Sequence, residues 1–192
     1  MDSKTRCAWS DGSDIYKAYH DDEWGKPEHD DRRLFEMLTL EAFQAGLSWI
    51  TILKKREGFR LAFDGFDPTK MAAYDDKKIE ELLQNEQIIR HRGKIAAAIH
   101  NARLFLEIQQ KYGSFDNMIW SYVNHTPIIG YRKTVHDIPA RTDISDKISK
   151  DLKKMGFKFL GSTTVYAFMQ AAGLVNDHTQ DCFLYPADKC SL

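Results

Sequence analysis

One acidic residue lies on what the sequence predicts to be the apolar side of a helix. The segment LEAFQAGLSW covers residues 40–49, and helical spacing from Leu34 puts Leu38 and Ala45 on the same side as Glu41. A carboxylate in apolar surroundings costs several kcal/mol unless a partner stabilises it. Glu41 therefore needs a partner, which is either a ligand or a basic side chain of the protein itself.

Aromatic residues accompany Glu41 in the sequence. Four of them could enclose a flat ring: Tyr16, Tyr19, Trp24 and Trp49. A planar ligand held there would form a hydrogen bond with Glu41. Tyrosine and tryptophan also fill ordinary protein cores, and in a core Glu41 would meet an arginine or lie exposed at a helix end. The residue types leave both interpretations open, a ligand pocket and a core.

Cysteine and histidine residues near the two ends of the chain form a candidate metal site: Cys7, His20, His178 and Cys182. The three residues between His178 and Cys182 would let one helical turn present both to a single ion. Two thiolates and two imidazoles complete a tetrahedral zinc site with no open position, which is typical of a structural site. The alternative is four unconnected residues with Cys7 a buried free thiol, and Cys190 is a rival for the fourth ligand.

A basic turn with the sequence IIRHRGK at 88–94 lies between two predicted helices. Backbone N–H groups at the start of the second helix could hold a phosphate, with nearby cations adding charge. The candidate contacts are Arg90, Arg92, Gly93 and Lys94. This is the geometry of a helix-hairpin-helix motif, although the Gly-x-Gly that is usual in the hairpin is missing. The alternative is a cationic loop between two packed helices.

Composition indicates a soluble globular protein. The chain has 192 residues, 43% hydrophobic and 29% charged, which suggests one domain or one domain with a lobe. It contains neither an apolar run long enough for a membrane span nor a signal core, so we expect a cytoplasmic location. The net charge is −1, but basic residues gather in 86–111 and 141–160. These segments could form one face toward phosphates, or they are ordinary solvated helix faces.

Helix signals cover most of the chain. Residues 1–29 look irregular, and 123–144 are the least regular part of the remainder. We expect helices over about 30–46, from Trp49 through Arg56, from Pro68, over 76–84, from the basic turn to Gly113, after Ser114, from Ser145 to Gly156, and over 163–172. The predicted caps are Asp30 or Asp31, Asp67, Ser114, Ser145 and Ser162. The only candidate strand is 157–160. The predicted fold is all-α, with seven to nine short helices.

Short recognisable motifs cover nearly the whole chain, and they include RCAW at 6–9, YHDDEWG at 19–25, LExxQAGLSW at 40–49, IIRHRGKI at 88–95 and FMQAAGLVNDH at 168–178. In these motifs, in their order and in the lack of any large insertion, the chain resembles the bacterial 3-methyladenine DNA glycosylase I family. The sequence departs from the family's pattern in two places. Ala8 stands where glycine is common, and Phe43 stands where a polar residue is common.

The resemblance implies an all-α fold of the helix-hairpin-helix DNA glycosylase superfamily. It implies a single glycosylase domain over 1–192, either undivided or in two helical lobes, with the terminal segments 1–30 and 174–192 joined by one structural zinc ion. The ligands carried over from the family are the four candidates already named, Cys7, His20, His178 and Cys182. The loop at 128–140 receives no role from the resemblance.

The resemblance also implies an enzyme of base-excision repair. Such an enzyme hydrolyses the N-glycosidic bond of 3-methyladenine in alkylated double-stranded DNA, releases the free base and leaves an abasic site. Glu41 would be the base-recognising carboxylate and Trp49 the stacking indole. The other pocket residues would be Tyr16, Tyr19, Trp9 and Trp24.

Three further expectations concern the reaction and the assembly. We see no lysine placed as a Schiff-base nucleophile, so we expect no strand cleavage and a monofunctional glycosylase. We expect a monomer. Two alternatives remain at this point, a glycosylase with a wider range of alkylated bases and a damaged-DNA binder without enzyme activity.

Overall fold

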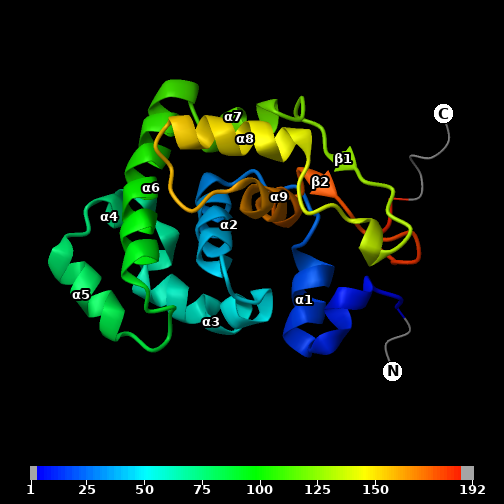
Figure 1. Cartoon of the computed structure of the whole chain (residues 1–192), viewed down its shortest axis with the longest axis horizontal. Coiled ribbons are helices and arrows are strands. Elements are labelled where there is room, and N and C mark those ends of the chain that lie inside the picture. The colour runs from blue at the N-terminus through cyan, green and yellow to red at the C-terminus, as the bar shows by residue number, and fades with distance from the viewer. Residues whose placement is uncertain (1–3, 187–192) are drawn as a thin grey trace.

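A computed structural model describes residues 4–186 of the chain (Figure 1). The described part is almost entirely helical, which confirms the all-α prediction. Its α-helices are α1 Asp14–Asp22, α2 Asp31–Gln44, α3 Trp49–Ala62, α4 Pro68–Ala72, α5 Asp76–Gln84, α6 Arg92–Tyr112, α7 Phe115–Ser121, α8 Asp143–Lys154 and α9 Ser162–Ala171. The 3-10 helices are η1 Ala8–Gly12, η2 Asp64–Phe66 and η3 Val135–Asp137. Within residues 4–186, every helix is too short or too polar to span a bilayer.

Side-chain caps explain where several helices begin. The Asp30 carboxylate accepts a hydrogen bond from the Arg33 N–H at 2.9 Å at the start of α2, and Asp67 accepts one from the Thr69 N–H at 2.9 Å before Pro68. Ser114 caps α7 in the same way. The predicted starts of these three helices are confirmed.

Two predicted caps are wrong by a few residues. Helix α8 is capped by Thr142, and Ser145 is its third residue, because the two side chains and backbone N–H groups bond reciprocally in a capping box. Helix α9 is capped by Gly161. Ser162 is its first residue and uses its hydroxyl to bond Asp146 instead of its own helix.

The N-terminal region is more ordered than predicted. Residues 1–29 were expected to be irregular, but they contain η1 and α1, and Ser13 caps α1 by accepting a hydrogen bond from the Tyr16 N–H at 3.4 Å. The sequence DGSD at 11–14 has the residue types of a turn, but its Ser13 and Asp14 begin a helix. Gly25, with φ +77°, ends this segment.

The predicted strand is also wrong. Residues 157–160 form no strand, and the extended pairing lies elsewhere, between β1 Ile128–Ile129 and β2 Val175–Asn176, which run parallel. A further bridge joins Arg132 to Thr179. The pairing attaches the irregular segment 128–140 to the C-terminal segment.

Helix α2 is the centre of the fold, with α3, α6 and α9 packed around it (Figure 1). All ten residues from 34 to 43 are buried. Aromatic contacts fix the helix to its neighbours, including Phe35 against Phe105 and Phe43 against Phe59, with ring centroids 4.8 and 4.7 Å apart. A helix buried on all sides is a rigid base for any functional side chain that it carries.

Gly173 follows α9 at a point where no side chain fits. Its φ is +72°, and a Cβ atom there would lie 2.3 Å from the carbonyl carbon of Lys26. We expect Gly173→Ala to lower the free energy of unfolding by about 3 kcal/mol, because both the backbone conformation and the clash oppose a side chain. Urea denaturation measures this change.

Gly161→Ala is the matched control. A Cβ atom at Gly161 would meet nothing within 4 Å, and its φ of −69° suits any residue. We expect this variant to lose less than about 1 kcal/mol. Equal losses in the two variants would contradict the packing described for Gly173.

Candidate active site and metal centre

A cavity of about 360 Å³ opens between α1, α2, α3 and α9. All six residues assigned to a pocket from the sequence line it: Trp9, Tyr16, Tyr19, Trp24, Glu41 and Trp49. The structure therefore brings together side chains from four separate parts of the chain. The pocket interpretation of the aromatic residues is favoured over a filled core.

Glu41 is the most unusual residue of the cavity. Its side chain projects from the buried face of α2, it is 4% exposed, and its Oε2 atom has no hydrogen-bond partner in the described structure. Burial raises the pKa of its carboxyl group to about 8. An unsatisfied buried acceptor is costly, so its presence in a cavity indicates a ligand that supplies the missing donor.

Within residues 4–186 no arginine bonds Glu41, although several arginines lie near α2. They converge on a different carboxylate, Glu36, which accepts from Arg56 Nε at 2.6 Å and from Arg60 Nε at 2.9 Å. Arg33 also bonds Glu36, at 3.2 Å. The alternative in which Glu41 is a core residue paired with an arginine is therefore wrong.

The aromatic walls of the cavity are held by contacts among themselves. Trp9 packs edge-on against Trp24 and Tyr16, with ring centroids 5.0 and 5.6 Å apart, and the Tyr19 and Trp49 centroids are 5.4 Å apart. The Tyr16 hydroxyl accepts a hydrogen bond from the Ile50 N–H at 3.1 Å, which ties α1 to the start of α3. The aromatic walls are therefore held in place by one another, and the cavity that they enclose suits a flat ring.

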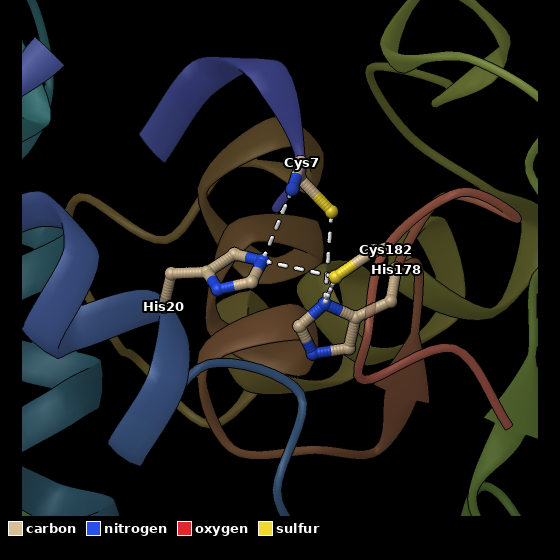
Figure 2. Close-up of side chains that lie close together, drawn as sticks. All are labelled: Cys7, His20, His178 and Cys182. Atoms are coloured by element: carbon tan, nitrogen blue, oxygen red, sulfur yellow. Dashed lines mark hydrogen bonds between the residues drawn. The ribbon is translucent and has the colours of Figure 1, made fainter. Parts of the chain in front are cut away.

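The four candidate metal ligands meet in one buried cluster beside the cavity (Figure 2). Their ligand atoms all lie within 4.8 Å of one another. Cys182 Sγ is 3.4 Å from His20 Nε2 and 3.5 Å from His178 Nδ1, and Cys7 Sγ is 3.6 Å from the same His178 atom. His178 and Cys182 lie in the turn after β2 and not on a helix as expected. The cluster could hold a metal ion.

The outer nitrogen of each histidine is bonded to the protein. His20 Nδ1 lies 2.9 Å from the Asp21 carboxylate, which Arg6 Nε holds at 2.9 Å. His178 Nε2 lies 3.1 Å from the Trp24 carbonyl oxygen. These partners leave His20 Nε2 and His178 Nδ1 directed at the cluster centre, the arrangement that orients metal-binding imidazoles.

Donors also surround the two sulfur atoms. The Thr179 N–H donates to Cys7 Sγ at 3.4 Å, and the Leu184 N–H donates to Cys182 Sγ at 3.5 Å. The hydrogen bond with Cys182 lowers the pKa of the Cys7 thiol, against the opposing effect of burial. The donor set of two sulfurs and two imidazoles fits a tetrahedral, soft-ligand metal site.

Comparison with known proteins agrees with this geometry. The sequence matches the family described as methyladenine glycosylase over residues 9–185. It is 53% identical over 184 residues to the DNA-3-methyladenine glycosylase 1 of Escherichia coli strain K12, covering 96% of this chain and 98% of that protein. The chain belongs to the methyladenine glycosylase family.

Two further relatives support this assignment to the methyladenine glycosylases. The DNA-3-methyladenine glycosylase of Haemophilus influenzae is 50% identical over 178 residues, covering 93% of this chain and 96% of that protein. A solved structure of 3-methyladenine DNA glycosylase I from Staphylococcus aureus, which describes recognition of 3-methyladenine by that enzyme, has a TM-score of 0.92 and 42% identity. It covers 96% of this chain and 98% of that one.

In this methyladenine glycosylase, α5 and α6 form the two helices of the predicted hairpin. Arg90 and Arg92 are exposed beside the turn, and each forms an ion pair with a neighbouring acid, Glu86 and Glu80 respectively. Gly93 lies in the first turn of α6. These residues are placed at the surface, where a phosphate could reach them.

Lys94 differs from the expectation that it adds an exposed charge. It is 8% exposed, and its ammonium group donates to the carbonyl oxygens of Phe43 at 2.9 Å and Ala45 at 2.5 Å. Burial lowers the pKa of this lysine. A cation suits this position because the last carbonyls of α2 have no partners within their helix and carry the negative end of its dipole.

Five cavity residues were missed from the sequence: Gln44, Val135, Ile138, Ala167 and Gln170. The loop at 128–140, which was given no role, supplies Val135 and Ile138, so that expectation is wrong. Its irregular sequence contains no periodic signal that could reveal its position. Gln44 and Gln170, by contrast, lie inside motifs that carried the family resemblance.

The raised pKa of Glu41 predicts a stability that falls as pH rises. The folded protein keeps this proton up to about pH 8, whereas the unfolded chain loses it near 4.5. The protonated Glu41 carboxyl group therefore makes its full contribution to the free energy of unfolding below pH 4.5, and this contribution is lost as pH rises from 4.5 through 8. Across that window we expect Glu41→Gln to gain on the order of 4 kcal/mol relative to wild type.

Urea unfolding of both proteins at a series of pH values measures this difference. The amide of the variant does not titrate, so the pH dependence of the variant's stability comes from all the other groups and is the reference for wild type. Stability curves that run parallel from pH 4.5 to 8.5 would contradict a protonated, buried Glu41.

Proposed function

We propose that this methyladenine glycosylase is a base-excision repair enzyme that hydrolyses the N-glycosidic bond of 3-methyladenine in alkylated DNA. The observation that carries the proposal is the unpartnered Glu41 carboxyl group at the wall of an aromatic cavity. Two relatives that the chain matches over nearly their whole length are named DNA-3-methyladenine glycosylases, and this supports the same activity. The products are free 3-methyladenine and an abasic site.

The target base must leave the duplex before it can enter the cavity. A methylated, weakly paired base costs less to unstack and unpair than a normal base, so flipping itself contributes to selection. Inside the cavity, Trp49 and Tyr19 offer ring faces to the base. A cationic ring interacts more favourably with such faces than a neutral ring does.

Methylation at N3 places a positive charge on the base and weakens its bond to the sugar. The reaction therefore needs little protonation of the leaving group. Glu41 in its ionised form accepts a hydrogen bond from the base and stabilises its charge. The cation in turn favours ionisation of a carboxyl group whose pKa burial alone raises to about 8.

The cavity contains no amine that could form a Schiff base. None of its lining residues between 4 and 186 is a lysine, and Lys94 lies with its ammonium on carbonyl oxygens of α2. This arrangement supports a monofunctional glycosylase that releases the base without cutting the strand.

We further propose that Cys7, His20, His178 and Cys182 hold one zinc ion. With four protein ligands the ion would be structural, joining the segments 1–30 and 174–192 without activating water. Residues 1–3 and 187–192 of these segments, and with them the rival ligand Cys190, lie outside the described residues.

The remaining expectations are part of the same proposal. The chain would act as one glycosylase domain over 1–192, as a monomer, in the cytoplasm. Arg90, Arg92 and Gly93 would contact the DNA backbone at the hairpin. Lys94 would assist from inside the protein by holding the end of α2.

Base release from methylated DNA tests the enzyme activity. We expect wild-type protein to release 3-methyladenine, identified by chromatography, and Glu41→Gln to release it about a hundredfold more slowly, because the amide cannot balance the positive charge. Glu57→Gln is the control, since Glu57 is an exposed glutamate on α3 outside the cavity. Equal rates for wild type and Glu41→Gln would remove Glu41 from the mechanism.

The same assay separates the two alternatives. Release of 7-methylguanine at a comparable rate would show a wider range of alkylated bases. Binding of alkylated DNA without release of any base would show a binder without enzyme activity. Either result would overturn the proposed function as stated.

Elemental analysis tests the metal. We expect one zinc ion per chain in wild type and less than half of that in Cys182→Ser, with a lower melting temperature because the tails are no longer joined. Cys190→Ser should keep full zinc content. Zinc near zero in freshly purified, folded wild type, or a loss confined to Cys190→Ser, would contradict the ligand set.

A further inference from the structure

A second buried carboxylate lies beside the cavity. Asp177, directly before the metal-cluster residue His178, is 0% exposed. It accepts hydrogen bonds from Arg132 Nε at 2.8 Å, from the Tyr166 hydroxyl at 2.6 Å and from Gln170 Nε2 at 2.9 Å. Unlike Glu41, this carboxylate is fully satisfied, and the guanidinium balances its charge.

Two of these three donors belong to parts of the chain that form the cavity wall. Gln170 lines the cavity from α9, and Arg132 lies in the loop that supplies Val135 and Ile138. The loop passes so close to the carboxylate that a Cβ atom on Gly130 would lie 1.9 Å from its Oδ1 atom. Asp177 therefore fixes both an amide and a loop of the cavity wall.

The chemistry of a carboxylate determines which way the Gln170 amide faces. The NH₂ end of the amide faces Asp177, because Gln170 Nε2 donates to Asp177 Oδ2 at 2.9 Å and the carboxylate oxygens also accept from Arg132 and Tyr166. The other end, Oε1, receives no hydrogen bond from any residue that the structure describes. The cavity wall thus carries a second acceptor that lacks a donor.

We propose that Gln170 Oε1 is a second hydrogen-bond acceptor for the base, and that Asp177 is the positioning residue that holds it in this orientation. The inference rests on the proposed function, because it assumes that a base enters the cavity. When Glu41 is ionised, the wall carries two acceptors, Glu41 and Gln170, and selects purines that present N–H donors, such as an exocyclic amino group. A base with a carbonyl group in that position would place its oxygen against Gln170 Oε1, and two acceptors in contact repel each other.

Binding of two free bases tests the acceptor. The first is 3-methyladenine, and the second is 3-methylhypoxanthine, which has a carbonyl in place of the amino group. Quenching of tryptophan fluorescence gives both dissociation constants, since Trp9, Trp24 and Trp49 line the cavity. We expect Gln170→Met to weaken 3-methyladenine binding about tenfold and to leave 3-methylhypoxanthine binding unchanged or tighter, because the amino base loses a hydrogen bond whereas the carbonyl base loses a repulsive contact.

Gln109→Met is the matched control. Gln109 also donates from Nε2 to a carboxylate, Asp31 at 2.6 Å, but it lies on α6 and lines no part of the cavity. We expect wild-type affinity for both bases from this variant. A loss of base affinity equal to that of Gln170→Met would make the effect one of stability and overturn the proposal.

Asp177→Asn tests the positioning role. The new amide can donate as well as accept, so the Gln170 amide is free to turn and present its NH₂ end to the cavity. We expect the preference for 3-methyladenine over 3-methylhypoxanthine to fall about tenfold, with zinc content unchanged. Adding Gln170→Met to this variant should lower the preference no further, because the same interaction is already lost.

The two proposals fail in different ways. If wild type releases no base from DNA, the proposed function is wrong. If wild type releases the base while Gln170→Met binds both bases with wild-type affinity, only the acceptor role is wrong. Because Gln170→Met replaces an amide by a side chain of similar length, it decides the question even if Asp177→Asn fails to fold.

Discussion

The burial of α2 on every side is the constraint on which the rest of the structure depends. The Glu41 carboxyl group stays buried without a partner because the closely packed, rigid helix that carries it does not expose it to water. Phenylalanine contacts with α3 and α6 supply that rigidity. Glu36, one turn earlier on the same helix, gathers the nearby arginines. Glu41 is thereby left as a free acceptor, the property that a site for a cationic ligand requires.

Helix α1 connects the metal cluster to the cavity. Tyr16 and Tyr19 line the cavity, whereas the next residue, His20, belongs to the cluster. The Trp24 carbonyl oxygen near His178 strengthens this connection, because Trp24 is itself a cavity wall. The Cys/His cluster and the aromatic wall of the cavity are therefore built from the same short segment of the chain.

Sequence patterns predicted the parts of the site that obey simple periodicity or coordination chemistry. Helical spacing identified Glu41, and the combination of two cysteines with two histidines identified the cluster. The patterns failed where tertiary contacts decide: a turn-like DGSD that begins α1, and the loop carrying Val135 and Ile138, which is placed by the Arg132–Asp177 ion pair. Local signals cannot report contacts between residues that are far apart in the chain.

The position of Lys94 has a consequence for how the protein meets its substrate. This residue belongs to the first turn of α6, at the hairpin, yet its ammonium group is bonded to the end of α2, four residues from Glu41 at Ala45. The surface that would rest on a DNA backbone is thus fixed at a constant distance from the carboxyl group in the cavity. A duplex held at this hairpin would have to bring its base across that fixed distance to reach Glu41, and the energy needed to unstack and deform the duplex would then become part of lesion recognition.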